Sequence, residues 1–236
     1  MIKKTVLGFM ALAVLLSIAG GAQARDLTKD MQLDVFALGG ASTLVDAENF
    51  DSAGNLFHSR FDLGTKYTLG VAVPFGKLIT LETAFTSGPN NLVVSNTNTS
   101  PVAEQEYPIR DYIGSISAVV HAPFSYMGLR PYAEGGVEYD RFSPTPTAMT
   151  TALTKGFAAD STAQINHNDK LGINLGVGLD RKLTKRLTFR IDVRDHVTSS
   201  PAFGLPNTYS YANYPVSGRA NNIVYTAGIL FHLGKL

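Results

Sequence analysis

The sequence contains no cysteine and no tryptophan, and it is poor in charged residues. Without cysteine the chain can form no disulfide, no thiolate metal ligand and no lipid anchor on cysteine. Asp, Glu, Lys and Arg make up 17% of the sequence, against about 25% in soluble proteins. The formal net charge is +1, which gives no reason to expect a nucleic-acid partner. The composition therefore departs from that of an ordinary soluble domain.

Long hydrophobic runs are also missing, except near the N-terminus. Residues 6–18 are mostly apolar, follow two lysines and precede the small-residue site Ala22-Gln23-Ala24. A helix needs about 20 apolar residues to span a bilayer, so this shorter run predicts a cleaved secretory signal peptide. We expect residues 1–24 to be the signal peptide and residues 25–236 to form one exported domain.

The exported part consists of segments in which apolar and polar residues alternate with a period of two, as in a β-strand. In the last segment Tyr225, Ile229 and Leu233 share one face, and Thr226 and Gly228 share the other. Eight such segments can be marked, and the first and fourth show the weakest alternation. They are residues 31–41, 58–73, 78–87, 109–121, 129–142, 169–181, 187–198 and 222–234.

The connections between these segments alternate between short and long. The short ones contain turn residues or charges, and the long ones are rich in Asn, Ser, Thr, Pro and Ala. A compact soluble domain rarely has four long structureless loops, whereas an outer-membrane barrel has short periplasmic turns and long outer loops. The short connections are residues 74–77, 123–128 and 182–186, and the long ones are 42–57, 88–108, 143–168 and 199–221.

The alternation has a physical explanation in a membrane. Lipid offers no hydrogen bonds to the backbone, so only helices and closed sheets can cross it. We therefore predict an all-β fold: an eight-stranded antiparallel transmembrane up-and-down β-barrel over residues 25–236, with short periplasmic turns and long extracellular loops. The soluble alternative is a sandwich or lipocalin-like barrel with the opposite polarity. Export, the glycine-rich polar faces and the amphipathic last strand favour the membrane barrel.

The last two segments resemble a known family. The stretch 225–234, and Arg190-Ile191-Asp192-Val193-Arg194-Asp195 followed by Pro201 and Phe203-Gly204, are similar to the closing strands of small OmpA/OmpX-like outer-membrane barrels. The resemblance implies a place in the outer membrane of a Gram-negative-type bacterium, contact with its lipid and lipopolysaccharide, and assembly by the barrel-assembly machinery. Phe231 or Leu236 would then supply the aromatic or terminal signal for assembly.

The polar faces carry charges that the barrel would turn inward. An eight-stranded barrel has an interior just wide enough for side chains to fill, and buried charges there should pair. The interpretation that we favour is a polar core that plugs the barrel, and the alternative is an ion path or gated pore. The expected network consists of Lys66, Glu82, Arg130, Glu134, Glu138, Asp180, Arg190, Asp192 and Arg194, with Asp34 and Asp62 as further acidic members.

Glu134 and Glu138 flank a pair of glycines, which leaves room for Arg190 or Arg194 from the seventh segment. We expect that contact to require the fifth and seventh strands to meet across the lumen. It is the most specific pairing that the sequence suggests.

A catalytic or metal site is not expected. His196 lies beside Asp195 and before Ser199-Ser200, but neighbouring residues of a strand point to opposite faces, so Asp195 cannot easily orient His196. No histidines have the spacing of a metal site, and we expect no cofactor. We therefore expect a structural or surface-interaction role with a mostly plugged lumen, in which the loops can contact an extracellular ligand. A narrow passive channel and a lipid A-modifying enzyme are the alternatives.

Overall fold

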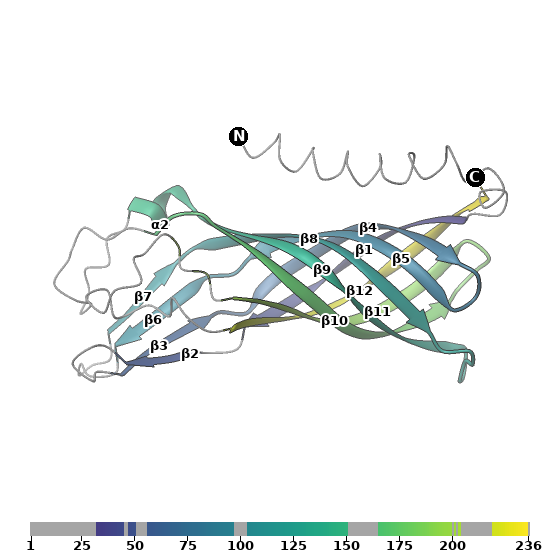
Figure 1. Ribbon diagram of the computed structural model, residues 1–236, viewed down its shortest axis with the longest axis horizontal. Coiled ribbons are helices and arrows are strands. Elements are labelled where there is room, and N and C mark those ends of the chain that lie inside the picture. The colour runs from purple at the N-terminus through teal and green to yellow at the C-terminus, as the bar shows by residue number, and fades with distance from the viewer. Residues whose placement is uncertain are drawn as a thin grey trace.

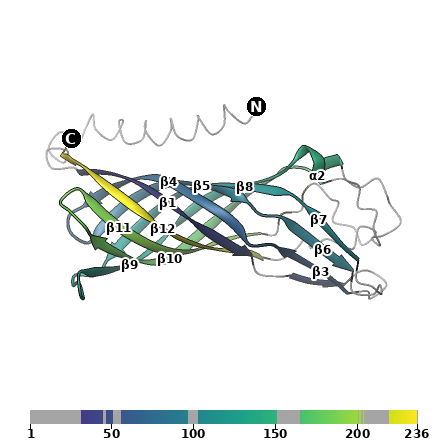
Figure 2. The same cartoon turned by 180° about the vertical axis from the view of Figure 1, so that it is seen from behind.

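The computed structural model describes residues 32–44, 47–50, 56–96, 103–150, 165–199, 201, 203 and 219–235. The expected signal peptide, residues 1–24, lies outside this range, as does Leu236. The chain forms a long barrel with shorter strands continuing from one end (Figures 1 and 2). Among the described residues, no helix combines the length and hydropathy needed to cross a membrane.

Eight antiparallel strands close into the barrel, in the order β1-β12-β11-β10-β9-β8-β5-β4. Because β1 pairs with both β4 and β12, the barrel has no free edge. The predicted fold class is confirmed, and the observed ends lie close to the predicted ones except at the start of β4. The strands are β1 (Gln32–Leu44), β4 (Gly64–Phe75), β5 (Ile79–Pro89), β8 (Ile109–His121), β9 (Leu129–Pro144), β10 (Asn168–Lys182), β11 (Leu187–Ser199) and β12 (Arg219–Lys235).

The sequence analysis predicted that the long connections would be structureless. For the first two of them this prediction is wrong. They contain β2 (Ala47–Phe50), β3 (Leu56–Phe61), β6 (Leu92–Asn96) and β7 (Ala103–Tyr107), which form a separate four-stranded sheet. The predicted strand 58–73 is therefore two strands, β3 and β4, which are interrupted at residues 62–63. Pairing between β3 and β6 joins the two hairpins and satisfies backbone groups that a polar loop would expose to water.

The third long connection contains the short helix α2 (Pro146–Thr150). Thr145 precedes it, and its hydroxyl accepts a hydrogen bond from the Ala148 N–H at 3.2 Å. This is the usual N-cap arrangement, with proline at the first helical position.

The short connections are tight turns at the opposite end of the barrel. Gly76 and Gly128 have positive φ angles of 71° and 77°, a conformation that glycine adopts without strain. Next to Gly128, the backbones of Tyr126 and Leu129 exchange two hydrogen bonds of 2.9 Å. Thr184 accepts hydrogen bonds from the backbone N–H groups of Arg186 and Leu187 in the third turn.

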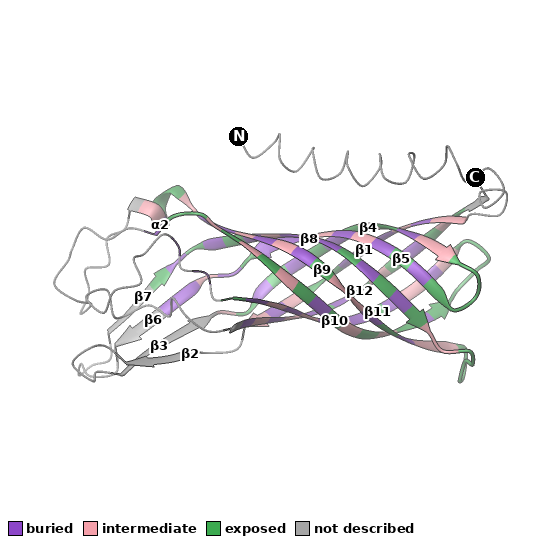
Figure 3. Ribbon diagram, viewed as in Figure 1, coloured by how far each residue is buried: buried purple, intermediate pink, exposed green. Residues whose placement is uncertain are grey.

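The two faces of the strands differ in the sense expected for a membrane barrel (Figure 3). On β10, Leu171, Leu175 and Val177 are exposed by 80%, 57% and 60%. Between them, Asn174 is completely buried. Apolar residues thus face outward and polar residues face the lumen, the reverse of a soluble barrel.

Part of the lumen is nevertheless apolar. Five buried residues form a hydrophobic cluster on the side of the barrel made by β1, β4, β5 and β12. The members are Phe36, Leu38, Ala72, Ala84 and Leu230. The lumen therefore has an apolar cluster on these strands, and most of the buried charged side chains come from the other four strands.

Candidate functional site

Buried charge is the main feature of the lumen. Eight carboxylates and three Lys or Arg side chains that point inward are buried. A lumen with this composition has an excess of negative charge when all of these groups are ionised. The acidic residues are Asp34, Glu82, Asp111, Glu134, Glu138, Asp140, Asp180 and Asp192, and the basic residues are Lys66, Arg190 and Arg194.

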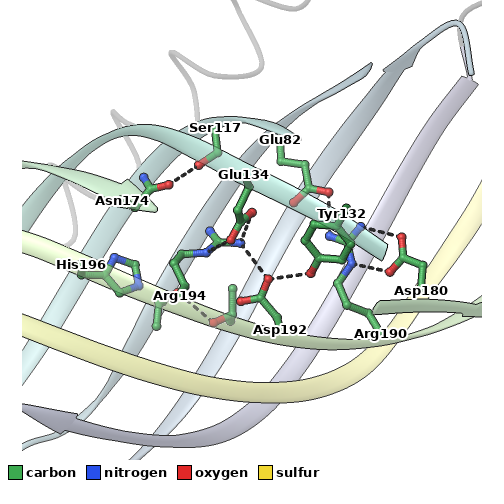
Figure 4. Close-up of polar contacts among 12 residues, drawn as sticks. Glu82, Ser117, Tyr132, Glu134, Asn174, Asp180, Arg190, Asp192, Arg194 and His196 are labelled. Atoms are coloured by element: carbon green, nitrogen blue, oxygen red, sulfur yellow. Dashed lines mark hydrogen bonds and ion pairs between the residues drawn. The ribbon is translucent and has the colours of Figure 1, made fainter. Parts of the chain in front are cut away.

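Arg190 lies at the centre of the first cluster (Figure 4). Its Nε and Nη2 donate to the two oxygens of Asp180, at 2.8 and 3.0 Å, and its Nη1 donates to Glu82 Oε1 at 2.6 Å. The guanidinium also lies over the ring of Tyr132, 4.6 Å from the centroid. The ring of Phe36 lies 5.8 Å away. Two carboxylates and two aromatic rings thus surround a single side chain, which uses the planar fork of Arg in a way that Lys could not.

Arg194 forms a second cluster one step further along β11 (Figure 4). Its Nη2 donates a hydrogen bond of 2.7 Å to Glu134 Oε2, and its Nε lies 2.5 Å from Glu134 Oε1 in an ion pair. Asp192 lies 3.5 Å from Arg194 Nη2 and accepts a hydrogen bond of 2.6 Å from the Tyr132 hydroxyl. Tyr132 therefore connects the two arginine clusters into one network.

Glycines on β10 allow these contacts to form. β9 and β11 both pair with β10, so they are separated by one strand and do not face each other across the lumen. A Cβ atom on Gly176 would lie 2.5 Å from Glu134 Oε1, and one on Gly178 would lie 2.3 Å from the Tyr132 ring. The lumenal face of β10 must carry no side chains at these positions, because side chains from β9 and β11 pass over it.

His196 and Glu138 form a pair at the next level. The His196 Nδ1–Glu138 Oε2 distance is 2.6 Å, and both residues are buried. Asn174 lies on the strand between them and accepts a hydrogen bond from Ser117 at 2.8 Å. Asp195 points outward and accepts a hydrogen bond from Asn221, so it does not orient His196.

Lys66 and Asp111 form a buried ion pair nearer the extracellular loops. Asn222 and Asn90 also donate hydrogen bonds to Asp111, at 3.1 and 3.4 Å. The expected network included Lys66 but not Asp111. The neighbouring Asp140 is buried, and its Oδ1 has no hydrogen-bond partner among the described residues.

Two members of the expected network lie outside the lumenal clusters. Arg130 lies at the end of the barrel that bears the short turns, where it donates to the backbone oxygens of Ala122, at 3.0 Å, and of Lys77. It is the second residue of β9, and the carbonyls of the adjoining turns lie within its reach. Asp62 lies between β3 and β4, outside the strands of the barrel.

Histidines add two contacts near the short turns that the expected network did not include. His121 Nε2 lies 3.1 Å from Asp180 Oδ2, and His232 Nδ1 lies 2.9 Å from Asp34 Oδ1. In each contact the carboxylate is one that the sequence predicted to face inward, and the histidine lies on another strand. The described residues contain no group of three or more His, Asp or Glu side chains that could hold a metal ion.

An aromatic pair lies near the end of the lumen that bears the long connections. The rings of Phe142 and Phe203 meet edge to face, with centroids 6.1 Å apart, and both residues are buried. The backbone oxygen of Phe203 also accepts a hydrogen bond from Asn166 at 2.7 Å. Residues of two different long connections thus cover the inward face of β9 above the charged levels.

No known family model matches the sequence, and no curated protein matches it at the sequence level. Several solved structures are similar in fold. The outer membrane protein OprG of Pseudomonas aeruginosa has a TM-score of 0.54 and 14% sequence identity, and the match covers 88% of this chain and 99% of that one. Neisserial surface protein A has a TM-score of 0.47 and 12% identity, and covers 86% of this chain and 97% of its own. The similarity to OprG shows a shared fold. The chain has the fold of the small OmpA/OmpX-like outer-membrane β-barrels.

Proposed function

We propose that the protein is a closed outer-membrane barrel that does not conduct, with a structural or surface-interaction role. The observation that carries the proposal is the burial of the lumenal charges. Arg190, Arg194 and Glu138 are 1%, 3% and 4% exposed. Residues at successive levels of the lumen are thus out of contact with water, so the side chains fill the space through which an ion would pass.

The contacts among these side chains support a permanent plug. A conducting state would require Arg190 to leave both Asp180 and Glu82, or Arg194 to leave Glu134. Removing one partner of a buried ion pair costs about 3–5 kcal/mol. Spontaneous opening by movement of these residues would therefore be rare.

The extracellular sheet supports a surface role. Its order is β2-β3-β6-β7, so β2 and β7 are its edge strands. An edge strand can pair with an extended segment of another protein. A partner on the cell surface would thus meet an ordered sheet at the end of the barrel that bears the long connections.

We also infer that residues 1–24 are cleaved on export, and that the mature barrel lies in lipid and lipopolysaccharide after insertion by the barrel-assembly machinery. The outward-facing leucines and valines of β10 support contact with lipid. Heat-modifiable gel mobility of the protein from an outer-membrane fraction tests the location. Recovery from the soluble periplasm with unaltered mobility would contradict it.

Conductance tests the closed lumen. The purified protein in a planar bilayer should show no stable openings. The double variant Arg190→Ala/Arg194→Ala removes two large side chains and leaves their carboxylates, so it should conduct with a preference for cations. Arg110→Ala is the matched control, because Arg110 is exposed on the outer face and donates to the Tyr67 hydroxyl. Regular openings of the unaltered protein that are lost or changed in Glu138→Ala would favour the passive channel.

The enzyme alternative rests on His196, the only described histidine that is completely enclosed with a carboxylate. This enclosure argues against it, since His196 is 1% exposed and a lipid substrate could not reach it. Lipid A from cells that express the protein should have an unchanged mass spectrum. A mass shift that disappears in His196→Ala would replace the proposed role with lipid modification.

A further inference from the structure

Exposed cations gather at the end of the barrel that bears the short turns. The exposed charged residues of the β4–β5 turn, of the last two positions of β10 and of the β10–β11 turn are all basic. The carboxylates that lie nearest to this end in the described part of the chain, Asp34, Glu82 and Asp180, are buried in the lumen. The exposed cations are Lys77, Arg181, Lys182, Lys185 and Arg186.

The same turns expose large apolar side chains. Phe124, Tyr126 and Met127 of the β8–β9 turn are 64%, 72% and 79% exposed. Leu78 and Leu183 are exposed beside the cations of the other two turns. In Figures 1 and 2 the β8–β9 turn, coloured teal, forms a hook that projects sideways from the barrel. This turn therefore extends away from the wall of the barrel and carries exposed apolar side chains.

The turns are fixed in position. Arg130 donates hydrogen bonds to the backbone oxygens of Ala122 and Lys77, and thereby joins the β4–β5 turn to the β8–β9 turn. The His121 N–H also donates to the Leu78 oxygen at 2.7 Å. In the β10–β11 turn, the N–H groups of Leu183 and Thr184 donate to the Leu187 oxygen, and the His232 N–H donates to the Arg186 oxygen. Backbone contacts thus hold all three turns, which reduces the entropy that ligand binding would cost.

We propose that this rim binds the headgroups of anionic phospholipids in the inner leaflet, while the hook of residues 124–127 lies in the lipid interface. Cations attract the phosphate charge, and exposed aromatic and aliphatic side chains bury themselves at the boundary between headgroups and acyl chains. A soluble anion would use only the first of these features, so the combination points to a lipid. The proposal does not depend on whether the lumen conducts.

Native mass spectrometry of the full mature protein tests the proposal. From mixed micelles that contain equal amounts of phosphatidylglycerol and phosphatidylcholine, the protein should retain phosphatidylglycerol about tenfold more often. Each cation near an anionic surface contributes about fivefold to binding. The variant Lys77→Gln/Lys185→Gln/Arg186→Gln should therefore lose the preference. Arg110→Gln, which removes one exposed charge from the outer face near the opposite end, should retain it.

Two further measurements separate the features. Phe124→Ser/Met127→Ser should reduce retention of both lipids while the preference for phosphatidylglycerol remains. Inorganic phosphate at the same concentration as the lipid should not displace phosphatidylglycerol. Complete displacement by phosphate would show a site for free anions and would overturn the proposal, as would equal retention of the two lipids by the unaltered protein. Heat-modifiable mobility of every variant confirms that the barrel is folded.

Discussion

The lumen has two sides that are filled in different ways. On the side of β1, β4 and β12, Phe36, Leu38 and Leu230 pack as an ordinary hydrophobic core. On the side of β9, β10 and β11, long charged side chains lie across a strand of glycines. The apolar side is stabilised by burial of area, whereas the charged side depends on each partner being present. The two sides should therefore respond differently to mutation.

Arg190→Ala should produce the largest loss of stability. It leaves Asp180 and Glu82 buried without their main partner, which costs about 3–5 kcal/mol. Urea unfolding in lipid vesicles, followed by gel mobility, measures the loss. The variant Arg190→Leu/Glu82→Leu/Asp180→Asn, which removes the charges together, should recover much of it. If Arg190→Ala is as stable as the unaltered protein, the lumen does not depend on this cluster.

On the apolar side, Leu230→Ala should cost about 2–4 kcal/mol, because it leaves a cavity in a buried cluster. Its effect should change little with salt or pH, since no charge loses its partner. The same unfolding experiment at two ionic strengths measures this. A loss of stability that changes strongly with ionic strength would contradict the separation of the two sides.

Gly176→Ala should cost about 1–3 kcal/mol, the usual range for an overpacked site. The new methyl group would meet Glu134 at 2.5 Å and push it away from Arg194. Gly135→Ala is the matched control, since its Cβ would lie 3.4 Å from Leu175 on the outer face. Equal losses of stability in the two variants would show that the loss comes from replacing a glycine in a strand, and not from a clash with the Glu134 side chain.

The smallest effect is expected on the outer face of the barrel, between β9 and β10. Arg141 and Asp169 are 3.8 Å apart and partly exposed, and pairs of this kind contribute about 0–1 kcal/mol. Arg141→Ala should therefore leave the unfolding midpoint almost unchanged. A loss comparable to that of Arg190→Ala would mean that burial does not set the value of an ion pair in this barrel.

The sequence predicted the barrel because its later strands have one apolar and one polar face. β10 shows this best, with leucines outward and glycines or Asn174 inward. In β1 and β8 the inward face is itself partly apolar, with residues such as Phe36 and Ile113, so the alternation is blurred. Asp111 was missed for this reason.

The candidate site could be predicted less completely. Alternation gives the face of a residue but not its height in the barrel or its partner. The pairing of Arg194 with Glu134 depends on the register of β10 with both neighbours. The same register places His196 beside Glu138, from a different strand. The extracellular sheet was missed because its strands are short and lie in polar segments.

The glycines of β10 also affect the order in which the barrel can assemble. Tyr132, Glu134, Asp192 and Arg194 all lie on β9 and β11, which are joined through β10 in one continuous stretch of chain. Three consecutive strands are thus enough to complete this part of the network before β1 meets β12. The C-terminal half can thus form these contacts before the barrel closes. Glu82, which lies in the other half of the chain, then pairs with Arg190.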